Sequence, residues 1–138
     1  MKRITVTALF TLATLVTAGG AMAQGRAARA TVPFDFTVGD KLLPAGNYEI
    51  TAPSTGIIEV QDREKHVAML AATTYDSHES RNGGKLVFDK IGDQYFLHEV
   101  LCEQAAINVN LPLSKQEKRA QRQEASIDNT SQVFVATN

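Results

Sequence analysis

The chain has 138 residues, with 14 basic and 15 acidic side chains, so its formal net charge is −1. A chain of this length forms one hydrophobic core without disulfides or metals and leaves no room for a second domain or a large cofactor-binding fold. The near balance of charges argues against a nucleic-acid-binding protein, which would normally have a basic stripe, and against a disordered chain, which would have a much larger charge imbalance.

Residues 1–23 are predicted to be a signal peptide. Two cations open the chain, and residues 4–18 are uncharged with an apolar centre. Ala21 and Ala23 then give the small-x-small pattern that a signal peptidase accepts, so cleavage is expected before Gln24. The product would be exported, periplasmic or extracellular.

An uncleaved membrane anchor is the alternative, because the uncharged stretch from Ile4 to Gly25 is just long enough to span a bilayer. Its apolar centre is short and is followed by Gly19 and Gly20, which favours a cleaved signal. We therefore expect no stable membrane span after cleavage.

The β domain is expected to span residues 31–111, after a small, basic and flexible lead-in at 24–30. From Val32 to Val38 apolar and polar side chains alternate, which is the pattern of a half-buried strand. Pro33 restricts this strand to an edge or a strand start, because proline donates no backbone hydrogen bond.

The rest of the domain contains short β-branched or aromatic runs separated by turn signals. They are predicted to be strands and cover residues 47–52, 57–61, 66–74, 85–90 and 95–103, with a weaker run at 105–111. The alanine-rich run at 66–74 would also suit a helix. Residues 75–84 are expected to be a mobile loop. Gly92-Asp93 should connect the strands at 85–90 and 95–103 as a hairpin.

Residues 112–138 are expected to form a charged helix and a C-terminal tail. Ser114 and Glu117 have the spacing of a capping box, which predicts a helix from Lys115 to Ala125. Only two alanines offer it an apolar stripe, and so short a helix is marginal in water.

This segment is also where we expect a partner to bind. The apolar run at 133–135 either adds an edge strand to the domain's own sheet or pairs with an edge of another protein. The expected partner-binding residues are Ser114, Lys115, Lys118, Arg119, Arg122, Val133, Phe134 and Val135.

Together these patterns predict an all-β fold: a small antiparallel sandwich or barrel of about six to seven strands with a short C-terminal helix. A parallel sheet is excluded, because no helical pattern lies between the strands to form crossovers.

Three motifs resemble a family of small, secreted, uncharacterised bacterial proteins with a VPFDF…LPAGxY opening and a Pro-x-Ser-Lys motif before a charged helix. They are VPFDFTVGDKLLPAGNYEI at 32–50, KLVFDKIGDQYFLHEV at 85–100 and LPLSKQEK at 111–118. The resemblance covers most of the chain after the signal. It implies a single β domain exported from a bacterial cell, and no catalytic or ligand-binding residue.

The histidines are the residues most worth testing as a metal site. His66, His78 and His98 are accompanied by Asp76 and Glu79, but only the set around His78 is local in sequence, and it lacks the spacing of zinc ligands. We expect solvated or singly hydrogen-bonded histidines and no metal or cofactor.

No nucleophile is evident either. The chain has no G-x-S-x-G elbow, and its lone Cys102 lies four strand residues from His98, about 13 Å, too far for a hydrogen bond. Asp89 and Asp93 are interpreted as solvated turn carboxylates. We expect no enzyme and a free, packed thiol at Cys102.

The sequence therefore predicts an exported, non-enzymatic β domain with a binding or structural role in the bacterial envelope, its partner an unknown envelope protein or a small ligand. One alternative is a barrel that carries a small apolar ligand, and the other is a histidine- or metal-dependent hydrolase. An empty interior lined by Phe34, Phe36, Tyr48 and Ile50 would favour the carrier. A solid core would favour the interaction module, and histidines close together in space would favour the enzyme.

Overall fold

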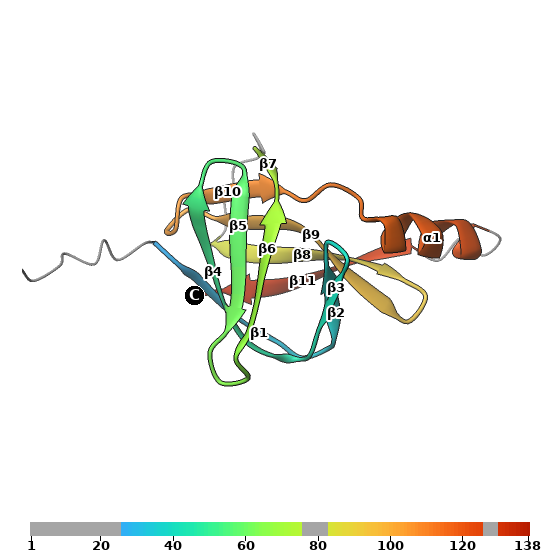
Figure 1. Ribbon diagram of the computed structural model, residues 1–138, viewed down its shortest axis with the longest axis horizontal. Coiled ribbons are helices and arrows are strands. Elements are labelled where there is room, and N and C mark those ends of the chain that lie inside the picture. Colours follow the sequence, from blue (N-terminus) through green and yellow to red (C-terminus); the bar gives the residue numbers. More distant parts are fainter. Residues whose placement is uncertain (1–25, 76–82, 126–129) are drawn as a thin grey trace, which may run out of the picture.

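The structure is a computed structural model that describes residues 26–75, 83–125 and 130–138. Within these ranges the chain is mostly β-strand, arranged in two sheets with one short helix (Figure 1). The predicted all-β fold with a C-terminal helix is therefore confirmed. The predicted signal peptide, with Ala21, Ala23 and Gln24, lies outside the described residues, as do Asp76, His78 and Glu79 of the predicted loop.

The first sheet has four antiparallel strands in the order β1-β4-β5-β6. These are β1 (Ala28–Val32), β4 (Gly46–Ser54), β5 (Ile57–Asp62) and β6 (Val67–Ala72). In β4 the side chains of Tyr48 and Ile50 are both buried, because alternate residues of a strand point to the same face.

The second sheet has the order β11-β8-β9-β10-β7, and its neighbours are also antiparallel. Its strands are β7 (Thr74–Tyr75), β8 (Gly84–Ile91), β9 (Gln94–Cys102), β10 (Ile107–Asn110) and β11 (Thr130–Thr137). A small hairpin of β2 (Phe36–Val38) and β3 (Lys41–Leu43) attaches to β9 through a parallel bridge between Thr37 and Phe96.

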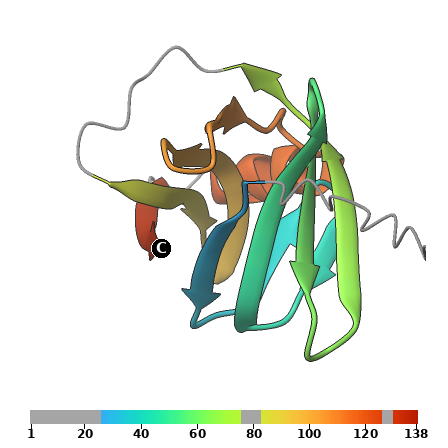
Figure 2. The ribbon, with the colours of Figure 1, turned by 90° about the vertical axis from the view of Figure 1, so that its left-hand side faces the viewer.

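The two sheets meet at two corners and wrap around a shared interior (Figure 2). At one corner the chain passes from β6 into β7 through Thr73, whose backbone N–H donates to the carbonyl of Gly56 over 2.8 Å. At the other corner, backbone hydrogen bonds between Arg29 and Asn138 join β1 to the end of β11.

The interior is filled by side chains. The ring of Phe36 meets Tyr48 and Phe88 edge to face, with centroids 5.0 and 5.3 Å apart, and all three residues are at most 2% exposed. Phe34 meets Phe88 in the same way at 5.2 Å, and Ile50 is fully buried. The aromatic side chains that would have lined a ligand cavity are thus packed against one another as a core.

The N-terminal strand differs from its prediction. β1 begins at Ala28 within the expected lead-in, because the small side chains of Ala28 and Ala30 are buried against the core. The expected strand at 32–38 is also split after Val32, where Pro33 has no backbone N–H to continue the ladder. Asp35 Oδ1 accepts a 2.8 Å hydrogen bond from the Ala45 backbone at this break.

The C-terminal segment is part of the β domain. The helix α1 (Lys115–Glu124) begins where predicted, and Ser114 Oγ accepts a 3.0 Å hydrogen bond from the backbone N–H of Glu117. After it, β11 pairs with β8 over its whole length, from Thr130 opposite Ile91 onward. Of the two alternatives for the apolar run at 133–135, the structure therefore has the internal one, and the predicted tail is an edge strand.

Within the described ranges, no helix has the length and apolar character needed to cross a membrane.

Candidate functional site beneath the C-terminal helix

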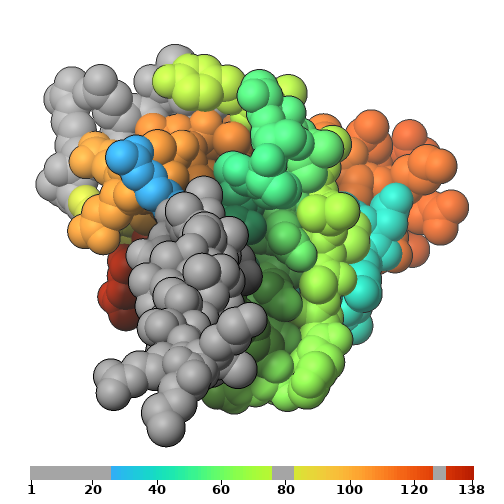
Figure 3. Space-filling model, turned by 60° about the vertical axis from the view of Figure 1, so that its left-hand side comes forward, coloured from blue at the N-terminus to red at the C-terminus, as the bar shows by residue number. Residues whose placement is uncertain are grey.

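The helix α1 packs on the outer face of the β8–β9 hairpin, away from the main core. Its Ala120 is buried against Ile91 and Phe96, and the three form a small cluster of their own. Gln116 Nε2 also donates to the backbone carbonyl of Asp40 over 3.1 Å, next to the β2–β3 hairpin. Figure 3 shows the helix projecting beside that hairpin. The apolar contact of Ala120 and the hydrogen bond of Gln116 thus hold a helix that lacks an apolar stripe.

A β-bulge positions His98 beneath this helix. Val87 lies opposite Glu99 and the next residue, Phe88, lies opposite Leu97, so His98 is the extra residue in β9. A bulge redirects the side chain of its extra residue and is common near functional sites. The carbonyl of His98 accepts a 2.7 Å hydrogen bond from the backbone N–H of Leu111, which holds the bulge in place.

Three side chains converge at this point: Asp89 from β8, His98 from β9 and Glu117 from the first turn of α1. One potential ligand atom from each lies within 4.8 Å of the other two. His98 Nδ1 is 3.5 Å from Asp89 Oδ2, and His98 Nε2 is 3.9 Å from an oxygen of Glu99. Gln132 of β11 donates to the other Asp89 oxygen over 3.4 Å. We call Asp89, His98 and Glu117 the carboxylate–histidine cluster.

Glu117 is the most deeply buried carboxyl of the cluster, at 4% exposure, and its Oε1 has no hydrogen-bond partner in the described part of the chain. Burial raises the pKa of Glu117 above its ordinary value, because the charged form is desolvated. The Ser114 backbone hydrogen bond lowers this pKa, the Asp89 charge raises it and His98 lowers it. The effect of burial on the pKa of Glu117 is therefore larger than the opposing effects of Ser114 and His98.

The sequence interpretation missed this cluster. It grouped His98 with His66, but His66 lies in the exposed turn between β5 and β6, in a left-handed conformation with φ 53°. It placed Asp89 in a solvated turn, whereas Asp89 is a strand residue opposite Phe96, close to the bulge. The hairpin register alone could have brought Asp89 near His98, but no spacing signal connects either residue to Glu117.

The exposed side of α1 carries a second feature, four cations on one face. At about 100° per residue, Lys115, Lys118, Arg119 and Arg122 fall within an arc of about 100°. All four are exposed, and none forms an ion pair within the described ranges. The buried Glu117 and Ala120 lie on the opposite side. We call these four residues the cationic stripe.

No family model matches the chain, and comparisons with curated proteins and with solved structures gave no match either. The resemblance of the three sequence motifs to small secreted bacterial proteins stays a prediction.

The other expected partner-binding residues have different environments. Val133 and Val135 are half-buried and pack against the main core, so internal packing uses them. Phe134 faces outward at 57% exposure, with Lys85 Nζ 4.8 Å from its ring centroid. Ser114 serves as the helix N-cap. Of the predicted set, the four cations and Phe134 are therefore the accessible ones.

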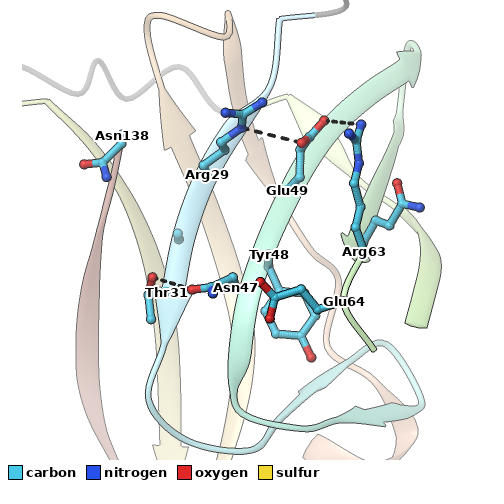
Figure 4. A pocket seen from close by; sticks show the side chains of 10 residues that line it. Arg29, Thr31, Asn47, Tyr48, Glu49, Arg63, Glu64 and Asn138 are labelled. Carbon is cyan, nitrogen blue, oxygen red and sulfur yellow. Dashed lines mark hydrogen bonds and ion pairs between the residues drawn. The ribbon is translucent and has the colours of Figure 1, made fainter. Parts of the chain in front are cut away.

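A polar groove of about 270 Å³ lies at the corner between β1, β4 and the end of β11. Glu49 stands between two arginines there, 3.5 Å from Arg29 Nε and 3.1 Å from Arg63 Nη2 (Figure 4). Both arginines are largely exposed, and exposed ion pairs contribute little to stability. Because one carboxylate already occupies both guanidinium groups, this groove is the weaker candidate for binding a charged ligand.

Proposed function

We propose that the protein is an exported, non-enzymatic β domain that binds the acidic surface of an envelope protein through the cationic stripe of α1. The observation that carries this proposal is the stripe itself: four exposed cations without ion-pair partners in the described ranges.

The stripe has an energetic cost that binding would explain. Lys115 and Arg119 lie four residues apart, as do Lys118 and Arg122, and like charges at this spacing destabilise a helix by about 0.2–0.5 kcal/mol per pair. A complementary acidic surface would relieve this repulsion, steer association and select the partner.

The docking of α1 supports the same proposal. Ala120 and Gln116 hold the helix against the hairpin, so the four cations project from a positioned element. A surface ordered before binding loses less conformational entropy in the complex. The packed interior around Phe36, Tyr48 and Phe88 supports an interaction module over a carrier of apolar ligands.

The experiment is site-specific photo-crosslinking in the cell envelope. A photoreactive residue replaces Leu113, which is exposed beside the first turn of α1, and in a control it replaces Thr55, in the β4–β5 turn at the opposite end of the domain. We expect a discrete crosslinked protein from position 113 that is absent from position 55. The same product from both positions would contradict the proposal.

Charge is tested with paired variants in the position-113 background. Arg119→Gln/Arg122→Gln removes two stripe cations, and Arg26→Gln/Arg63→Gln removes two exposed cations elsewhere. We expect the first pair, and added salt, to reduce the crosslink at least fivefold, while the second pair leaves it unchanged. Equal yields from the two pairs would show that the stripe is not the binding surface.

A further inference from the structure

We propose that Asp89, His98 and Glu117 bind one divalent transition-metal ion between the first turn of α1 and the β8–β9 hairpin. This site is independent of the binding function proposed above. Its ligand set, one imidazole and two carboxylates, suits borderline cations such as Zn²⁺.

The geometry brings the three donors close to a coordination sphere. One ligand atom from each residue lies within 4.8 Å of the others. An ion bound at about 2.0–2.2 Å from nitrogen and oxygen ligands holds neighbouring donors about 3–4 Å apart, so small side-chain rotations would close the site. All three residues come from regular elements that are paired or packed, which keeps the backbone positions fixed.

Two buried atoms in the cluster lack hydrogen-bond partners in the described part of the chain: Glu117 Oε1 and His98 Nδ1. Glu117 is more than nine-tenths buried, and leaving a buried polar group without a partner is destabilising because its desolvation is not compensated. Both residues contribute donors to the same cluster. A bound cation would satisfy both atoms at once.

The surroundings also fit a metal site. With Nδ1 as the ligand atom, the opposite ring nitrogen, Nε2, lies 3.9 Å from Glu99, beyond hydrogen-bond distance. A small rotation would form the carboxylate–histidine–metal arrangement that orients ligating imidazoles. Gln132 holds the second oxygen of Asp89 in a similar supporting role. When ionised, Asp89, Glu99 and Glu117 carry three negative charges beside the neutral imidazole that a metal ion requires, and a divalent cation would balance most of that excess.

A metal ion here would join two separate elements. Glu117 belongs to α1, whereas Asp89 and His98 belong to the hairpin, so one ion would clamp the helix to the sheet. Because a ligand that binds only the folded state stabilises it, Zn²⁺ should raise the melting temperature.

The test is calorimetric titration of the purified, chelator-treated protein with Zn²⁺, alongside thermal unfolding with and without the ion. The variants are Glu117→Gln and His98→Gln, which keep side-chain size. The matched controls are Glu103→Gln and His66→Gln, which remove an exposed carboxylate and an exposed histidine. We expect one equivalent of Zn²⁺ in the wild type, at least tenfold weaker binding in each cluster variant and unchanged binding in the controls.

Three outcomes would overturn the proposal: no saturable binding by the wild type, equal affinity in Glu117→Gln and the wild type, or loss of binding in His66→Gln. Circular dichroism of each variant shows whether it is folded. If His98→Gln does not fold, Glu117→Gln decides alone, because glutamine at this helix position preserves the capping pattern.

Discussion

Arg29 and Asn138 exchange backbone hydrogen bonds although they come from opposite ends of the described chain. The N–H of Asn138 donates to the carbonyl of Arg29 over 2.8 Å, and the N–H of Arg29 donates back over 3.3 Å. This pair joins the first strand of one sheet to the last strand of the other. Both residues line the corner groove drawn in Figure 4.

A chain that ends at Ala125 should therefore lose much of its stability. Removing β11 leaves the edge of β8 unpaired and removes the packing of Val133 and Val135, each worth about 1–1.5 kcal/mol. We expect a loss of about 3 kcal/mol or more in the free energy of unfolding, measured in urea. Phe134→Ala, on the exposed face of the same strand, should cost less than about 1 kcal/mol. A truncated chain with an unchanged unfolding midpoint would show that β11 does not contribute to the stability of the domain.

Ala120→Asp should release α1 from the hairpin. The substitution buries a carboxylate against the apolar side chains of Ile91 and Phe96, which cannot stabilise its charge. The expected cost in the free energy of unfolding is about 2 kcal/mol. We expect faster hydrogen exchange across α1, while β4 and β5 keep their protection. Ala125→Asp, the same change at an exposed position, provides the control. Unchanged exchange in Ala120→Asp would mean that polar contacts alone dock the helix.

Tyr48 should make the fold sensitive to alkaline pH. Burial, together with Asp62 and Asp35, raises the pKa of Tyr48 from 10.0 to about 12, and its hydroxyl donates to the carbonyl of Pro44. Because the folded state holds this proton more tightly, the associated stability is present below pH 10 and is lost as the pH rises through about 12.

Between pH 8 and pH 12 the free energy of unfolding, measured in urea, should fall by about 2 kcal/mol more in the wild type than in Tyr48→Phe. The same substitution at Tyr75, which is 83% exposed, should leave the alkaline loss unchanged. Parallel curves for wild type and Tyr48→Phe would contradict the assignment.

Cys102 should react slowly with thiol reagents in the folded protein. Its thiol is free and buried at 2% exposure, so a reagent or a second chain reaches it only after local opening. We expect one thiol per chain to be modified rapidly in denaturant and at least a hundredfold more slowly under native conditions. Thr55→Cys supplies a fast-reacting reference in an exposed turn. Native reaction of Cys102 at the reference rate, or a reducible dimer of the folded protein, would contradict this prediction.

The sequence by itself determined the features that depend on neighbouring residues. Alternation places Tyr48 and Ile50 on one face, because successive strand side chains point to opposite sides. Gly92 adopts φ 58° in the turn of the β8–β9 hairpin, which glycine accommodates without strain. Ser114 sets the start of α1, because its side chain caps a backbone amide within one turn.

Only the tertiary structure decided which distant segments meet. The bulge at His98 depends on the register that β8 imposes on β9, and the pairing of β11 with β8 depends on which sheet edge the other strands leave free. Glu117 approaches Asp89 and His98 because the helix packs across the hairpin through Ala120. Contacts between residues far apart in sequence follow from packing and edge pairing, and neither is encoded in local periodicity.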